Sequence, residues 1–214
     1  MSWSLLEALK SLIEKTYGIP PLIEDLGPYI VGDRGLRALY GSREAGARLL
    51  LRETRRGLSA ALYYPDSLVR HLEAHNPLHG LGDANIEEFA VLVEELDHLL
   101  TLAHRAHQGR RVSRLELEHH AAVTKYLVVI HFLGRQIRRR RLPEPLRAWA
   151  RHHLFERYVE GAGESETRYR RAARLARRYV DYLDSLGAAL RRAELLAFQG
   201  RPFQETQRFL GQIN

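Results

Sequence analysis

Two short motifs place a carboxylate and an imidazole about one helical turn apart. Glu95 is followed by His98, and Glu116 by His119, each at the spacing Glu-x-x-His. Residues three apart are neighbours on a helix surface, so the two side chains of each pair point to the same side of the helix. Because the chain has no cysteine, thiolate metal sites, disulfides and cysteine nucleophiles are excluded. Carboxylate and imidazole ligands without thiolates suit iron, manganese or zinc.

The first pair lies in a predicted helix from Asn85 to Gln108, where each residue advances the helical wheel by about 100°. On this wheel, Glu88 and Glu95 fall among apolar residues, on an arc that should be covered. His98 lies at the edge of that arc. The polar face of the same helix carries Glu87, Glu94, Asp97, Thr101 and Arg105.

The second pair lies in a predicted helix from Ser113 to Arg141. His119 is at the centre of the apolar stripe of this helix, and Glu116 lies beside the stripe. We expect Glu118 and Lys125 to point the other way, to solvent.

The heights of these residues along a helical bundle can be compared by counting from the turns. His98 lies 11 residues before Gly109 and His119 lies 10 residues after it, which places both at nearly one level. In a third predicted helix, His153 precedes the turn at Gly161 by eight residues, and a glutamate follows at helical spacing. The sequence therefore predicts a mononuclear or dinuclear site. Its predicted ligands are Glu95, His98, His119, His153 and Glu156, with Glu88, Glu116 and Tyr169 as second choices.

The inward Glu-x-x-His pairs resemble the motif of ferritin-like di-iron carboxylate bundles. The resemblance rests on Glu95 with His98, on Glu116 with His119, and on the four-helix pattern, roughly half of the chain. In that family the paired motifs lie on the second and fourth helices, with lone glutamates on the other two. Here they would lie on the first and second helices, with a histidine on the third. Because of this departure the resemblance does not support bridging glutamates or oxygen chemistry, and we do not place the chain in the family.

A buried ionic network is the alternative to a metal site, for example between Glu95 and an arginine such as Arg157. Burying an isolated carboxylate or imidazole is costly, so such groups must satisfy each other or a cation. Ser113 and Glu116 also have the spacing of a capping box, which would give Glu116 a structural role. No serine lies in a Gly-x-Ser-x-Gly context, and no glycine-rich loop indicates a nucleotide site.

These motifs belong to a predicted mainly α fold, with an antiparallel four-helix bundle over residues ~85–198. Short connections between long helices favour antiparallel neighbours. The four predicted helices are Asn85 to Gln108, Ser113 to Arg141, Pro145 to Glu160, and Glu164 to Phe198.

The N-terminal region is predicted to be smaller, α or α+β, and packed on the bundle. It begins with an amphipathic helix from Ser2, and it contains a candidate β-hairpin formed by segments 47–53 and 58–64. A short helix from Asp66 to His75 follows. The loop from Pro77 to Asp83 suggests a division into residues 1–80 and 81–214.

The charge pattern leaves two further functions open. The 214-residue chain has a net charge of +7, and 30 of its 33 basic residues are arginine. An arginine-rich binding or scaffold protein for nucleic acid or an acidic partner is one alternative, although no recognition motif accompanies the basic runs. A structural oligomerisation module without metal, such as a homo-oligomer, is another. For the metal site, hydrolytic and redox chemistry both stay open.

The sequence also bears on the protein's surroundings. It shows no signal peptide and no apolar stretch long enough to cross a membrane, so we expect a cytoplasmic protein that does not bind membranes. A single methionine and the absence of cysteine are typical of thermophilic proteins.

Overall fold

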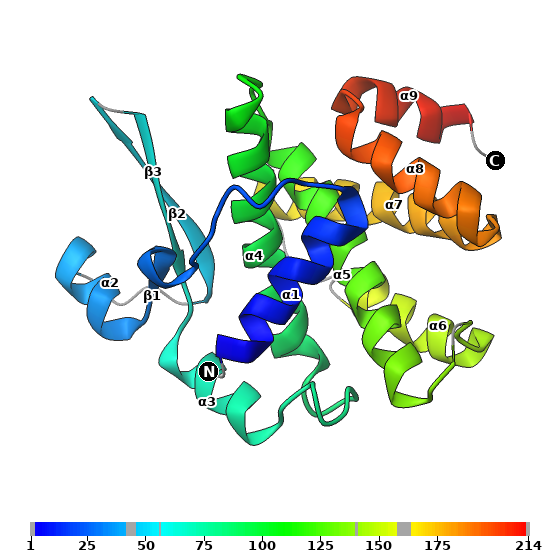
Figure 1. Ribbon diagram of the computed structural model, residues 1–214, viewed down its shortest axis with the longest axis horizontal. Coiled ribbons are helices and arrows are strands. Elements are labelled where there is room, and N and C mark those ends of the chain that lie inside the picture. The colour runs from blue at the N-terminus through cyan, green and yellow to red at the C-terminus, as the bar shows by residue number, and fades with distance from the viewer. Residues whose placement is uncertain (1–2, 42–45, 56, 140, 158–163, 213–214) are drawn as a thin grey trace.

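The computed structural model describes residues 3–41, 46–55, 57–139, 141–157 and 164–212. Within these ranges the chain is mainly helical with one small mixed sheet near the N-terminus, which confirms the mainly α class (Figure 1). The α-helices are α1 (Trp3–Tyr17), α2 (Asp33–Tyr40), α3 (Asp66–Ala74), α4 (Ile86–His107), α5 (Arg114–Gln136), α6 (Glu144–Arg151), α7 (Glu164–Ser185), α8 (Ala188–Gly200) and α9 (Phe203–Gln212). A 3-10 turn η1 (Gly27–Tyr29), a π-helical segment η2 (His152–Glu156) and strands β1 (Ile30–Val31), β2 (Arg48–Thr54) and β3 (Gly57–Tyr63) complete the fold.

Helices α4 and α5 form an antiparallel pair, as the sequence predicts. Gly109, with φ of 66°, turns the chain between them. Ser113 caps α5, because its side chain accepts a hydrogen bond from the backbone N–H of Glu116 at 3.1 Å. Helix α5 ends earlier than the predicted Arg141. Arg138 takes a left-handed conformation with φ of 54°, and the next N–H bonds back to the carbonyl of Gly134 at 2.9 Å.

Helix α4 lies in the middle of the molecule (Figure 1). It contacts α5, α1, α3, both long strands and η2, so it is covered on most of its circumference. Its buried residues include apolar side chains such as Phe89 and Leu92, and also Glu94, Asp97 and Thr101. A helix in this position has no fully exposed face to carry its polar residues.

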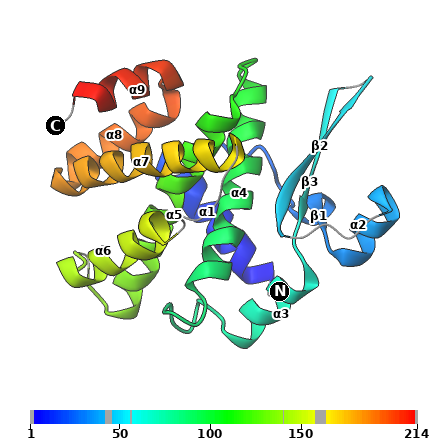
Figure 2. The same ribbon diagram turned by 180° about the vertical axis from the view of Figure 1, so that it is seen from behind.

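The last two predicted helices are divided further in the structure. The predicted helix from Pro145 to Glu160 is α6 followed by the π-helical η2. The predicted helix from Glu164 to Phe198 is two helices, α7 and α8, separated at Leu186 and Gly187. Helix α7 packs on α5 and runs across α4 in projection (Figure 2). The packing of α4, α5 and α7 is bundle-like, without the simple four-helix arrangement that we expected.

The sheet confirms the predicted hairpin. Strands β2 and β3 pair antiparallel, with Arg48 opposite Tyr63 and Thr54 opposite Gly57. The short β1 pairs parallel to β3, which gives the strand order β1-β3-β2. The end of the hairpin where β2 ends and β3 begins extends away from the helices, while its other end lies against α4 (Figures 1 and 2). This end brings Leu49 to Glu95, as described below.

One hydrophobic cluster joins the N-terminal elements to the helices. It includes Leu9 of α1, Leu62 of β3, Leu92 of α4, Val123 of α5 and Tyr179 of α7. The division at residue 80 stays a prediction. In the described part of the chain, no helix combines the length and apolar character needed to cross a membrane.

Candidate metal centre

Two helices bring Glu94, His98 and Glu118 together. Glu94 and His98 are four residues apart on α4, so their side chains leave the same face, and Glu118 faces them from α5. Nε2 of His98 lies 3.8 Å from Oε2 of Glu118. One ligand atom from each of the three residues lies within 4.8 Å of the other two. This buried group could hold a metal ion, and it is the one group of this kind within the described ranges.

Further polar side chains hold the three residues in place. Nζ of Lys125 lies 2.5 Å from Oε2 of Glu94, and the Tyr169 hydroxyl donates to Oε1 of the same carboxylate. Oε2 of Glu95 lies 3.6 Å from Nδ1 of His98 and accepts a hydrogen bond from the backbone N–H of Leu49 at 2.6 Å. Strand β2 and helix α7 therefore support the site from two sides.

The carboxylates make His98 basic. Burial lowers its pKa, but the close contact with the Glu95 carboxylate and the charges of Glu94 and Glu118 outweigh burial and raise the pKa to about 9. Burial raises the pKa of Glu118, whereas Lys125, His98 and Tyr169 together lower the pKa of Glu94 despite its burial. In the absence of a metal, His98 is therefore a cation among carboxylates at neutral pH.

Two atoms of this group lack hydrogen-bond partners. Nε2 of His98 and Oε2 of Glu118 are both inaccessible to solvent and make no hydrogen bond. They face each other at 3.8 Å, which is too long for a hydrogen bond. Unmet polar atoms are rare in protein interiors and each calls for an explanation, such as an ion.

A cavity of about 680 Å³ adjoins the group, between α4, α5, η2 and α7. Glu94, Glu118, Lys125 and Tyr169 are among its lining residues. Its remaining wall is largely apolar, with Val91, Leu154, Phe155 and several alanines. The volume lies in the range of about 300–1,000 Å³ that is typical of small-molecule sites.

The structure brings only part of the predicted site together. Glu95 and His98 are adjacent, and Tyr169, a second choice, also lies at this centre. His119 is elsewhere, in an aromatic pocket with ring centroids 5.7 Å from Phe198 and 5.5 Å from Phe203. Burial lowers the pKa of His119 to about 3.

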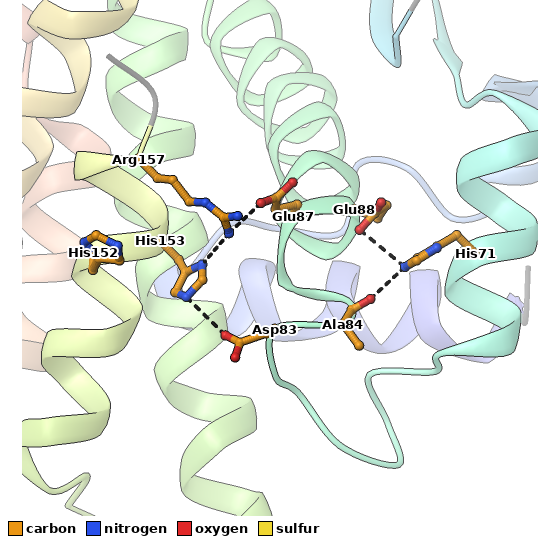
Figure 3. Close-up of a pocket in the computed structure, with 8 residues that line it drawn as sticks. All are labelled: His71, Asp83, Ala84, Glu87, Glu88, His152, His153 and Arg157. Atoms are coloured by element: carbon orange, nitrogen blue, oxygen red, sulfur yellow. Dashed lines mark hydrogen bonds and ion pairs between the residues drawn. The ribbon is translucent and has the colours of Figure 1, made fainter. Parts of the chain in front are cut away.

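His153 belongs to a different, open pocket (Figure 3). Its Nε2 lies 3.2 Å from Oδ1 of Asp83, and Arg157 contacts its Nδ1 at 3.3 Å. Arg157 also pairs with Glu87 at 2.7 Å, so it is not the partner of Glu95. On the opposite wall of the pocket, His71 bridges α3 to the start of α4 (Figure 3).

The other predicted ligands are paired with arginine or histidine side chains outside the centre. Glu156 pairs with Arg177 at 2.7 Å and with His152 at 3.2 Å. Glu116 pairs with Arg105 at 3.0 Å, and Glu88 with His71 at 3.4 Å. None of these side chains joins the group around His98.

Sequence reasoning missed Glu94, Glu118 and Lys125 as members of the centre. The interpretation that Glu118 and Lys125 point to solvent is wrong, because their side chains are only 12% and 13% exposed. The one sequence signal was the spacing Glu94-x-x-x-His98, which sets both side chains on one face. Because its residues are polar, that face was predicted to be exposed to solvent. In the structure α5 and Tyr169 of α7 cover it, so the prediction of exposure is wrong.

A second buried polar network lies further along α4. Nδ1 of His120 donates to Oδ2 of Asp97 at 2.8 Å, and the Thr124 hydroxyl donates to Oδ1 at 2.7 Å. Nε2 of His120 lies 2.7 Å from Oε1 of Gln199 on α8. Asp97 is fully buried, and each of its oxygens has a partner. This network joins α4, α5 and α8.

Comparisons of the chain with protein-family models, with curated proteins and with solved structures found no match in any of the three. The functional argument therefore rests on the geometry of the site.

Proposed function

We propose that the protein binds a divalent transition metal through Glu94, His98 and Glu118, and that the bound metal assists hydrolysis of a ligand in the adjoining cavity. One observation carries the proposal. Nε2 of His98 and Oε2 of Glu118 are buried without hydrogen-bond partners and face each other at 3.8 Å beside the cavity. A cation between them would satisfy both atoms.

The spacing and the donor types suit such an ion. Nitrogen and oxygen ligands at about 2.0–2.2 Å from zinc stand about 3.4 Å apart in a tetrahedron. The His98–Glu118 distance of 3.8 Å exceeds this by a few tenths of an ångström, and all three ligand atoms lie within 4.8 Å of one another, so metal binding would draw the side chains together. One imidazole and two carboxylates are suitable for zinc, manganese or iron.

Hydrolysis is favoured over redox chemistry by the composition of the ligand set. Three protein ligands leave a coordination position for water, as in catalytic zinc sites. A bound divalent metal supplies Lewis acidity, which lowers the pKa of water and polarises an oxygen of the substrate. Iron oxygenases instead use two histidines and one carboxylate, the reverse of this set.

The surrounding residues have positioning roles in this proposal. Lys125 and Tyr169 hold the Glu94 carboxylate, and Glu95 orients the ring of His98 through Nδ1. Metal ligands are commonly held by such outer hydrogen bonds. Because an imidazolium has no free lone pair on nitrogen, the metal must replace the proton that His98 releases to solvent.

Elemental analysis and calorimetry test the proposal on protein purified without a histidine tag. We expect one equivalent of zinc, manganese or iron, either co-purified or bound on titration after EDTA treatment. At a concentration of about 100 times Kd, the metal should stabilise the fold by about 2.7 kcal/mol, or raise Tm by about 5–10 °C.

The test variant is His98→Gln and the control variant is His107→Gln. Both residues lie on α4, but His107 is exposed and lies outside the group. Metal binding should be lost only in the first. Absence of stoichiometric metal together with no rise in Tm in the unmodified protein would reject the proposal, as would equal binding by both variants.

A further inference from the structure

The cavity beside the candidate metal centre has a charged end and an apolar wall. Arg170 and Arg174 are one turn apart on α7 and both line it. Arg170 contacts Glu166 at 3.2 Å, whereas no carboxylate of the described residues pairs with Arg174. Arg174 is exposed at the side of this partly open cavity, and an arginine without an acidic partner there is suited to an anionic group of a ligand.

The same cavity also has an apolar wall. This apolar wall is formed by Val91 of α4 together with Leu154 and Phe155 of η2. Alanines on α4, α5 and α7, including Ala173, keep the space open, because longer side chains at these positions would fill it. This wall would bury an aliphatic or aromatic body of a ligand, at about 0.8 kcal/mol for each buried methylene.

We infer that the cavity binds an amphipathic anion, with its carboxylate or phosphate at Arg174 and Arg170 and its apolar body against Phe155 and Leu154. This inference deepens the proposed function by naming its substrate class, and it rests on that function only for the reaction at the metal. The cavity, at about 680 Å³, is large enough for a chain of eight or more carbons. Binding of the anion itself does not require the metal.

Calorimetry with octanoate and octyl phosphate tests the inference, with 1-octanol and octylamine as neutral and cationic probes of the same length. Octanoate and octyl phosphate distinguish the two possible head groups. We expect at least one anion to bind in one equivalent, at least tenfold more tightly than octanol, and octylamine not to bind. Butyrate, which has the charge without the chain, should bind at least tenfold more weakly than octanoate.

Two variants locate the ligand. Arg174→Gln should weaken binding of the anion about tenfold. Arg171 is an exposed arginine of α7 outside the cavity, so Arg171→Gln should leave the affinity for the anion unchanged. Ala173→Leu should abolish binding by filling the space while metal binding is kept, because Ala173 is no part of the ligand set.

The outcomes separate this inference from the metal proposal. Binding of the anion by His98→Gln protein supports the cavity assignment even if no metal binds. Metal binding without any anion binding rejects the substrate class and leaves the metal proposal intact. Equal affinities for octanol and the anions, or equal effects of the two arginine substitutions, would overturn the inference.

Discussion

The metal-free protein should lose stability as the pH rises from about 6.5 to 9, because of His98. Its pKa in the folded protein is raised from the ordinary 6.5 to about 9 by Glu95, Glu94 and Glu118, which outweigh burial. The folded state therefore holds this proton more tightly than the unfolded chain does. The resulting stabilisation is fully present below pH 6.5 and is lost as the pH rises through 9. At about 1.4 kcal/mol for each pKa unit, the loss is about 3 kcal/mol.

Urea unfolding in EDTA at intervals from pH 6 to pH 10 measures this loss. His98→Gln keeps a hydrogen-bonding side chain but cannot titrate, so the variant should lack the alkaline decline. His107→Gln, at an exposed position of the same helix, should keep it. If the unmodified protein and His98→Gln lose the same free energy of unfolding between pH 6.5 and pH 9, the carboxylates do not hold a proton on His98, and the electrostatic account of the centre is refuted.

Three further perturbations address other parts of the buried polar layer. Burial lowers the pKa of His119 to about 3. Between pH 6.5 and pH 3, His119 is therefore protonated in the unfolded chain but stays neutral in the folded protein. His119→Phe should therefore abolish a decline of up to about 5 kcal/mol between pH 6.5 and pH 3, and an unchanged acid-unfolding curve would contradict this. Lys125→Met should destabilise the metal-free protein by about 3 kcal/mol, because it removes the cation beside buried Glu94. The same substitution should weaken zinc binding at least tenfold in calorimetry, because Lys125 holds the Glu94 ligand in place, and unchanged affinity would count against the centre. Asp97→Ala should cost about 3–5 kcal/mol in urea unfolding by leaving the His120 network incomplete, with zinc affinity unaltered.

Local sequence signals predicted most of the helices and the hairpin. Ser113 caps α5 as its spacing with Glu116 predicts, and segments 47–53 and 58–64 form the paired strands. The break between α7 and α8 was missed, because Leu186 and Gly187 interrupt a pattern that is otherwise helical on both sides. Where apolar periodicity continues across a break, only packing against other elements decides whether one helix or two will form.

The faces of α4 and α5 could not be assigned from polarity. A helical wheel treats a polar face as an exposed face, which holds for a helix on the surface of a domain. Helix α4 is central, and its polar face is covered by α5, with Tyr169 of α7 on Glu94 and Gln199 of α8 on Arg105. The carboxylate of Glu94 is tolerated there because Lys125 and Tyr169 arrive from these other helices. Lys125 and Tyr169 lie 31 and 75 positions after Glu94 in the sequence, so no local sequence pattern could predict these contacts.

The two buried polar networks on α4 differ in which atoms are left without a hydrogen bond: an amide nitrogen of Gln199 in one, and two potential metal ligands, His98 Nε2 and Glu118 Oε2, in the other. Around Asp97, both carboxylate oxygens accept hydrogen bonds, and both ring nitrogens of His120 contact a polar partner. That network holds α4, α5 and α8 together through the paired oxygens of Asp97 and both ring nitrogens of His120. Around His98, a nitrogen and a carboxylate oxygen face each other unmet, beside a cavity. Leaving buried polar atoms unmet costs about 1–3 kcal/mol each, which a bound cation would recover. Burial of polar groups is therefore common to both networks, whereas unmet ligand atoms next to open volume mark only the one around His98.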